Sequence, residues 1–137
     1  MKISSDSGVT PEMARACMDG KKVVITGATS GIGRATALAL GRMGANLLLV
    51  SRDRPSGVSL ARRIATLSAA ASAEFIAADL SSLAQVRSAA KHIRERFSTI
   101  DVLINNAGAR FDDFALTPDG CERTFATNHL GHFLLTG

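Results

Sequence analysis

Residues 21–33 read Lys-Lys-Val-Val-Ile-Thr-Gly-Ala-Thr-Ser-Gly-Ile-Gly. The first seven of them form a short β-branched run that ends in glycine, as expected of a buried parallel strand. A helix is predicted from about Gly31, with Arg42 in its last turn and Gly44 as the stop signal. Its apolar positions at helical spacing are Ile32, Ala35, Leu38 and Ala39.

The same alternation continues along the chain. Apolar runs at residues 46–51, 74–78 and 101–105 predict three further strands. A helix is predicted between the second and third strands, through Leu60, Ile64 and Leu67. The next helix is marked by Ser82 and Gln85 at capping-box spacing, and one face of it carries Val86, Ala90, Ile93 and Phe97.

After the fourth strand, a long loop from Ala109 leads to Thr117 and Pro118, which are predicted as the cap and first residue of a last helix. Strands that alternate with helices predict a parallel sheet with right-handed crossovers and helices on both faces. The expected fold is therefore α/β, a Rossmann-type doubly wound sheet that contains about four strands in this chain.

The chain has 137 residues, 46% of them apolar, which fits one globular domain. We expect a polar leader at residues 1–18 and a domain at residues 19–137. No apolar run approaches a bilayer span, and the leader lacks a signal-peptide core, so a cytoplasmic protein is predicted. Cys17 and Cys121 follow no Cys-x-x-Cys spacing and are expected to be reduced thiols.

The net charge of +4 does not predict nucleic-acid binding, because no basic block or aromatic platform accompanies it. The arginines occur singly or in pairs along the whole chain. His129 and His132 have a spacing that two metal ligands could use, but no cysteine or carboxylate set accompanies them. We expect neither a nucleic-acid partner nor a metal.

The loop between the first strand and the first helix carries glycines at positions 27, 31 and 33. Glycines there let the backbone turn tightly and approach a pyrophosphate, whose charge meets free N–H groups at the start of the helix. The alternative is a tight turn that merely needs glycine. The strand before the loop and the helix after it favour the phosphate interpretation.

The pattern Thr-Gly-x-x-x-Gly-Ile-Gly resembles the signature of short-chain dehydrogenases, and Asn105-Asn106-Ala107-Gly108 resembles their second motif. The resemblance covers about residues 19–137. Within the family, residues 125–136 look most like retinol-dehydrogenase and protochlorophyllide-reductase relatives. The resemblance implies an oxidoreductase that moves hydride between a nicotinamide dinucleotide and a carbonyl or alcohol substrate. It implies cofactor contacts from Gly27, Thr29, Ser30, Gly31, Ile32, Gly33, Arg52, Asp79, Leu80, Asn105, Asn106, Ala107 and Gly108.

Three asparagines at or near these motifs have a simpler interpretation as well. Asn105 and Asn106 can be ordinary turn residues before Gly108. By resemblance Asn128 belongs to the catalytic group and holds a water in the proton relay. It could equally be a helix residue whose side chain bonds a neighbouring carbonyl.

The choice of cofactor depends on the end of the second strand, which reads Ser51-Arg52-Asp53-Arg54. An acidic residue there accepts from a ribose hydroxyl and repels a 2′-phosphate, whereas a planar guanidinium suits the phosphate. Arg52 therefore favours NADP over NAD. Against this, Ser30 stands where many NADP-dependent members carry a basic residue, and Arg52 could be a solvated loop charge.

The resemblance also implies a serine and a Tyr-x-x-x-Lys pair that do the acid–base chemistry, and this chain contains no tyrosine. We therefore expect a truncated, inactive enzyme, with a non-catalytic dinucleotide-binding or interaction fragment as the alternative. A sheet that ends at the fourth strand exposes a hydrophobic edge. Self-association or a homo-oligomer is the expected result.

Overall fold

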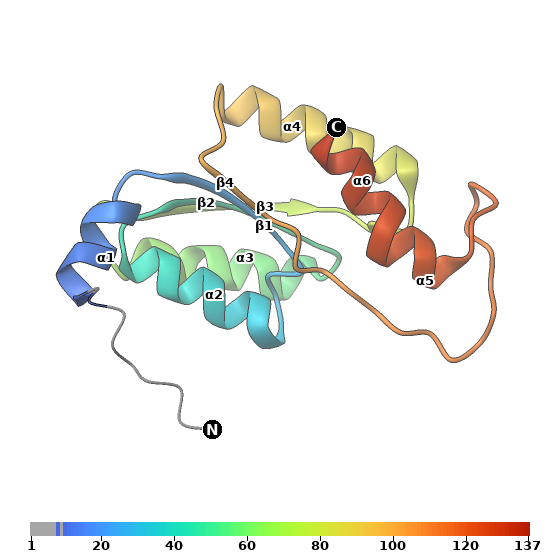
Figure 1. Cartoon of the computed structure of the whole chain (residues 1–137), viewed down its shortest axis with the longest axis horizontal. Coiled ribbons are helices and arrows are strands. Elements are labelled where there is room, and N and C mark those ends of the chain that lie inside the picture. The colour runs from blue at the N-terminus through green and yellow to red at the C-terminus, as the bar shows by residue number, and fades with distance from the viewer. Residues whose placement is uncertain (1–7, 9) are drawn as a thin grey trace.

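The computed structural model describes residue 8 and residues 10–137. Four parallel strands, β1 (Lys22–Thr26), β2 (Asn46–Ser51), β3 (Ser72–Ala77) and β4 (Val102–Ile104), form one sheet in the order β3-β2-β1-β4 (Figure 1). The predicted strands and the α/β Rossmann-type fold are confirmed. The third strand begins two residues earlier than the sequence pattern indicates.

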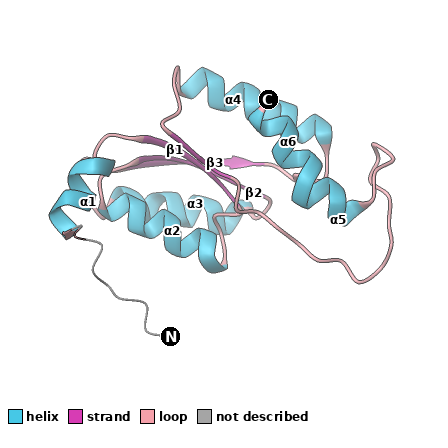
Figure 2. Ribbon diagram, in the orientation of Figure 1, coloured by secondary structure: helices cyan, strands magenta, loops and turns pink. Residues whose placement is uncertain are grey.

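Helices cover both faces of the sheet, with α2 (Gly31–Arg42) and α3 (Arg54–Ala65) on one side and α4 (Leu83–Arg96) and α6 (Gly131–Thr136) on the other (Figures 1 and 2). Successive residues of a strand point to opposite faces. Val23, Ile25, Leu47 and Leu49 accordingly pack in one core, and Val24, Leu48 and Val50 pack in the other. This explains why the two central strands are apolar without interruption.

Helix α2 buries a different face from the one that its apolar residues indicate. Its buried residues are Gly33, Ala37, Leu38 and Gly41, whereas Ile32 is 80% exposed. Small side chains on this face let the helix approach α3, where a Cβ on Gly41 would lie 2.7 Å from Ile64 Cγ2. The apolar Ile32 is left beside the glycine loop instead of in the core.

Side-chain caps close the starts of α3 and α4, and the sequence pattern predicted the second of them. Asp53 caps α3, and the Ser82 hydroxyl accepts from the Gln85 backbone N–H at the start of α4. The reciprocal half of the predicted capping box is missing, because the Gln85 side chain accepts from the Asp79 backbone N–H instead. This bond ties the start of α4 to the end of β3.

The predicted start of the last helix at Thr117 and Pro118 is wrong. Thr117 to Gly120 is a turn closed by the Gly120 N–H on the Thr117 carbonyl, and Gly120 has φ +76°. The helical segment begins later, with α5 (Arg123–Phe125), a π-helical turn (Ala126–Leu130) and α6. Pro-Asp-Gly is a turn sequence, and the left-handed glycine ends any helix that Pro118 would start.

A short helix, α1 (Pro11–Met18), precedes the sheet and was not expected from the sequence. The Thr10 hydroxyl accepts from the Met13 N–H and Pro11 occupies the first helical position, both typical of a helix start. Part of the leader predicted at residues 1–18 lies outside the described residues. Among those described, no helix is both long enough and apolar enough to cross a membrane.

Candidate functional site

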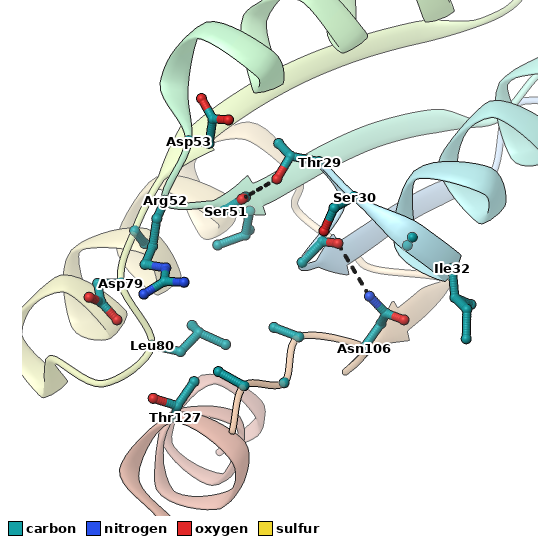
Figure 3. A pocket seen from close by; sticks show the side chains of 18 residues that line it. Thr29, Ser30, Ile32, Ser51, Arg52, Asp53, Asp79, Leu80, Asn106 and Thr127 are labelled. Atoms are coloured by element: carbon teal, nitrogen blue, oxygen red, sulfur yellow. Dashed lines mark hydrogen bonds between the residues drawn. The ribbon is translucent and has the colours of Figure 1, made fainter. Parts of the chain in front are cut away.

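A cavity of about 480 Å³ lies at the carboxyl ends of β1, β2 and β4, in front of helix α2 (Figure 3). This is the edge where open parallel sheets bind ligands. Every residue that the resemblance implied as a cofactor contact lines the cavity, except Asn105. The lining also includes Val50, Ser51, Asp53, Ala78, Ala109 and Thr127, none of which the sequence analysis predicted as a cofactor contact.

The glycine loop is close-packed against the second motif. Gly27 has φ +67°, and a Cβ there would lie 2.7 Å from Ala107 Cα. A Cβ on Gly33 would overlap the Gly27 carbonyl oxygen and the Asn106 side-chain nitrogen. These two glycines are therefore required for the two motifs to meet, and the close approach forms one wall of the cavity.

The start of helix α2 faces the cavity with its positive end uncompensated. The Ser30 side chain makes no capping hydrogen bond, and no acidic residue stands in the first turn. A Cβ on Gly31 would meet no atom within 4 Å, although its φ of +48° favours glycine. Free N–H groups beside open space form a site for an anion such as a pyrophosphate.

The end of β2 brings a cation, Arg52, and an anion, Asp53, to the cavity, and of these two only Asp53 has hydrogen-bond partners among the described residues. Both carboxylate oxygens of Asp53 accept from Ser56, one from its N–H at 3.1 Å and one from its hydroxyl at 2.6 Å. The Ser56 hydroxyl and N–H thereby lower the pKa of Asp53. Arg52 reaches over the cavity toward Asp79 and Leu80 (Figure 3), without an ion pair among the described residues. The Thr29 and Ser51 hydroxyls are 2.8 Å apart and join the two loops.

Asp79 and Leu80 form the far side of the cavity, after β3 (Figure 3). The Asp79 carboxylate accepts from the N–H and hydroxyl of Ser81, at 2.9 and 2.8 Å, which fixes its orientation. Leu80 is buried, and its backbone packs so closely on Gly131 that a Cβ there would overlap the Leu80 carbonyl oxygen. The carboxyl-terminal helix thereby supports this side of the cavity.

The two asparagines of the second motif have different surroundings. The Asn106 side chain donates to the Thr26 carbonyl at 3.0 Å and to the Gly27 carbonyl at 3.3 Å, so it ties the two motifs together. Asn105 lies outside the cavity and donates to the Thr136 hydroxyl at 3.1 Å. Asn106 therefore lines the cavity, whereas the Asn105 side chain contacts the carboxyl-terminal helix.

Asn128, the predicted catalytic asparagine, lies in the π-helical turn and outside the cavity lining. Its amide oxygen accepts from the Ala109 N–H at 2.8 Å, and its amide nitrogen donates to the Ala109 carbonyl at 2.9 Å. Asn128 thus holds the loop that follows the second motif. Ala109 follows Gly108 and Thr127 precedes Asn128 in the sequence, but only the folded structure shows that Ala109 and Thr127 line the cavity.

His129 and His132 do not form a metal site with other residues. The part of the chain that the structure describes contains no group of three or more His, Cys, Asp or Glu side chains able to hold a metal ion. The His129 ring stacks between Phe125 and Phe133, at centroid distances of 5.1 and 6.4 Å. His132 points the other way and is buried.

A family model described as short chain dehydrogenase matches residues 21–137. Human retinol dehydrogenase 13 is 43% identical over 125 residues, covering 90% of this chain and 37% of that protein. A short-chain dehydrogenase from Sphingobium yanoikuyae in complex with NADPH has a TM-score of 0.73 at 35% identity, covering 85% of this chain and 45% of that one. An NADH-dependent reductase, A1-R′, complexed with NAD has the same TM-score at 32% identity, covering 89% and 51%.

The chain spans about two fifths of the length of the curated relatives that it matches. The match runs through both glycine-containing motifs and the carboxyl-terminal helix, and it includes retinol dehydrogenases as the sequence analysis expected. The solved neighbours bind nicotinamide dinucleotides of both kinds. Sequence motifs, sheet order and relatives agree, and this chain therefore belongs to the short-chain dehydrogenase/reductase family.

Proposed function

We propose that the cavity binds NADP(H) and that the protein serves an oxidoreductase reaction in which hydride moves between the nicotinamide and a carbonyl or alcohol. One observation carries the proposal: the uncapped positive end of α2 opens into a cavity whose rim also carries Arg52, an arginine without an ion pair among the described residues. The pyrophosphate of a dinucleotide would bind at the start of α2, and the 2′-phosphate of NADP would bind Arg52.

The preference for NADP over NAD is supported by the different states of Arg52 and Asp53. An acidic residue after the second strand selects NAD when its carboxylate is free to accept from ribose hydroxyls. Asp53 uses both carboxylate oxygens to hold Ser56. Arg52 makes no hydrogen bond or ion pair with any residue that the structure describes, so its guanidinium is available to a 2′-phosphate.

Within this chain the residues bind and orient the cofactor. The N–H groups of the glycine loop would hold the pyrophosphate, Asp79 and Leu80 would contact the adenine, and Asn106 and Gly108 would contact the rest of the dinucleotide. When bound, the dinucleotide supplies the hydride. The chain contains no tyrosine, so the tyrosine acid–base group that the family resemblance implies is not among these 137 residues. We propose that this chain alone binds the dinucleotide without turnover.

The test is titration of the full chain with NADPH and NADH, followed by nicotinamide fluorescence. We expect Arg52→Ala to weaken NADPH binding about tenfold, the effect of losing one charge-assisted contact, and to leave NADH binding unchanged. Arg54→Ala is the matched control, because Arg54 is the next arginine along and does not line the cavity. Equal losses for both nucleotides would remove the NADP preference. No binding of either by a folded chain would overturn the proposal.

A second candidate is an interaction fragment, and the observation that favours it is the free edge of β4. This strand pairs with β1 on one side only in the described sheet, and Val102 is 37% exposed. Exposed apolar edge strands pair with other chains. Light scattering over a wide concentration range should detect dimers or larger species, and Val102→Lys should reduce them. A monomer at every concentration would contradict this reading.

A further inference from the structure

His132 is a buried polar side chain that the proposed cofactor contacts do not explain. It lies on α6, is 8% exposed and places Nε2 2.9 Å from the hydroxyl oxygen of Thr26. Thr26 is the last residue of β1 and is fully buried. The two residues are 106 positions apart, so this contact joins the last helix to the strand that leads into the glycine loop.

The Thr26 hydroxyl is in contact with four groups, which fixes where its proton lies. Its oxygen accepts from the backbone N–H groups of Asn106 and Ala107, both at 3.0 Å, and the Asn106 N–H is shared with the Ile104 carbonyl oxygen at 3.0 Å. A hydroxyl has two lone pairs and one proton, so only donation remains. The available acceptors are His132 Nε2 at 2.9 Å and the Ile104 carbonyl at 3.4 Å. The second distance is too long for a good O–H···O bond, so the proton points to the histidine.

The histidine must therefore be neutral and must carry its own proton on Nδ1. That nitrogen lies 3.2 Å from the Asn128 carbonyl oxygen, which can only accept. A proton on Nε2 would instead give the Thr26 oxygen a third incoming donor. The same residue, Asn128, holds Ala109 through its side chain. This stretch of helix thus contacts both Thr26 and Ala109, the residue that follows the second motif.

We propose that His132 is a positioning residue for the dinucleotide site, acting through the Thr26 hydroxyl. By accepting a hydrogen bond from the Thr26 hydroxyl, His132 orients both lone pairs of that oxygen toward the N–H groups of Asn106 and Ala107. Both of these residues line the cavity. The ligand of that cavity is taken from the proposed function, on which this inference rests, whereas the hydrogen-bond chain itself does not depend on the ligand.

A positioning role and a space-filling role predict different variants to be tolerated. His132→Gln keeps an acceptor oxygen near the Nε2 position, and His132→Phe keeps the volume without any acceptor. In the phenylalanine variant the Thr26 proton has only the distant Ile104 carbonyl, and the hydroxyl is free to rotate away from the turn. A space-filling role would make phenylalanine the milder change.

The first experiment measures NADPH affinity and the thermal midpoint of the full chain. We expect His132→Phe to weaken binding about tenfold, the effect of one hydrogen bond, and His132→Gln to restore it to within about threefold. His129→Phe is the control, because it makes the same replacement at an exposed position on the same helix. Binding by His132→Phe as tight as that of the unaltered chain would overturn the inference.

The second experiment needs no nucleotide. Long-range ¹H–¹⁵N correlation spectra of the folded chain report which ring nitrogen of a histidine carries the proton. We expect a neutral His132 ring protonated on Nδ1, and a shift of the Asn106 and Ala107 amide resonances in His132→Phe. A ring protonated on Nε2 would overturn the inference. If the chain binds no nucleotide but has the expected spectrum, the proposed function fails and the hydrogen-bond chain remains.

Discussion

The first strand–helix–strand unit, residues 21–51, and the carboxyl-terminal segment, residues 109–136, are held in place in different ways. In the first unit the two strands are almost entirely buried between the helical layers. In the second, four large apolar side chains are 52–78% exposed: Phe114, Leu116, Phe125 and Phe133. The first unit is stabilised mainly by the burial of apolar surface, and the second depends on particular polar contacts.

Those contacts are few, and each reaches far along the chain. Asp119 accepts from the Leu83 N–H at the start of α4, Asn128 holds Ala109, and His132 contacts Thr26. The Asp119 and His132 contacts join the carboxyl-terminal segment to α4 and β1, and the Asn128 contact fixes the first residue of the segment itself, Ala109, which lines the cavity. The glycine-loop side of the cavity is therefore held by close packing, and the side formed by the carboxyl-terminal segment is held by hydrogen bonds. We expect substitutions on the two sides to change stability and nucleotide affinity differently.

The largest expected effect is on the packed unit. Leu49 is fully buried, so Leu49→Ala should lower the free energy of unfolding by about 3–4 kcal/mol. Phe133 is 73% exposed, so Phe133→Ala should change it by less than about 0.5 kcal/mol. Equilibrium urea unfolding followed by circular dichroism measures both. If Leu49→Ala does not fold, Leu49→Val gives a smaller loss that can be measured. Equal losses from Leu49→Ala and Phe133→Ala would contradict the comparison.

The next prediction compares a glycine of the packed loop, Gly33, with a glycine of the carboxyl-terminal segment, Gly120. Gly33→Ala puts a methyl against the Gly27 carbonyl and Asn106, and we expect a loss of about 2 kcal/mol in stability together with weaker NADPH binding. Gly120→Ala is strained by its φ of +76° but meets no atom. It should cost about 1 kcal/mol and leave the affinity unchanged. Urea unfolding and nucleotide titration test the pair, and unaltered binding by Gly33→Ala would contradict the close-packed loop.

The hydrogen-bonded wall is tested by Asn128→Ala. This change removes both bonds to the Ala109 backbone, and we expect a loss of about 1–2 kcal/mol in stability. The Ala109 amide should then exchange its hydrogen faster, whereas the Leu49 amide in β2 should be affected only by the global change. Hydrogen exchange followed by NMR distinguishes these. An Ala109 amide that exchanges at its original rate would show that Asn128 does not hold the loop.

The smallest effect concerns the start of the carboxyl-terminal helix. The backbone N–H groups of Thr124 and Phe125 lower the pKa of Glu122 by donating to its carboxylate. Because the folded pKa lies below the unfolded one, this stabilisation is present above the unfolded pKa and is lost as pH falls through the folded pKa. Glu122→Gln should therefore lower the thermal midpoint near neutral pH and have no effect in acid.

The measurement is a series of thermal unfolding curves from about pH 7 to about pH 3, across the range in which glutamate titrates. Asp113→Asn is the control, because Asp113 lies in the same segment, is exposed and makes no hydrogen bond or ion pair among the described residues. The difference between Glu122→Gln and the unaltered chain should shrink as the pH falls. A difference that stays constant with pH would mean that the cap acts through its shape and not its charge.

Sequence patterns predicted the sheet well and the final segment poorly. The strands could be predicted because a buried parallel strand is a short apolar run, so that a few consecutive residues are enough to identify it. The last helix was misplaced because Thr-Pro begins turns as readily as helices, and the Pro-Asp-Gly signal after it was not used. The exposure of Ile32 was missed because helical spacing identifies an apolar face without showing which side meets the core.

The sequence by itself determined the order of strands and helices, the family and the residues of the two motifs at the cavity, because each depends on local residue types and spacing. Only the tertiary structure decided that Asp53 caps a helix while Arg52, within the described part of the chain, has no partner, that Asn128 holds Ala109, and that His132 contacts Thr26. These depend on the directions of side chains and on contacts between distant positions. A hydrogen bond requires atoms about 3 Å apart in a defined direction, and only the packing of the elements sets both.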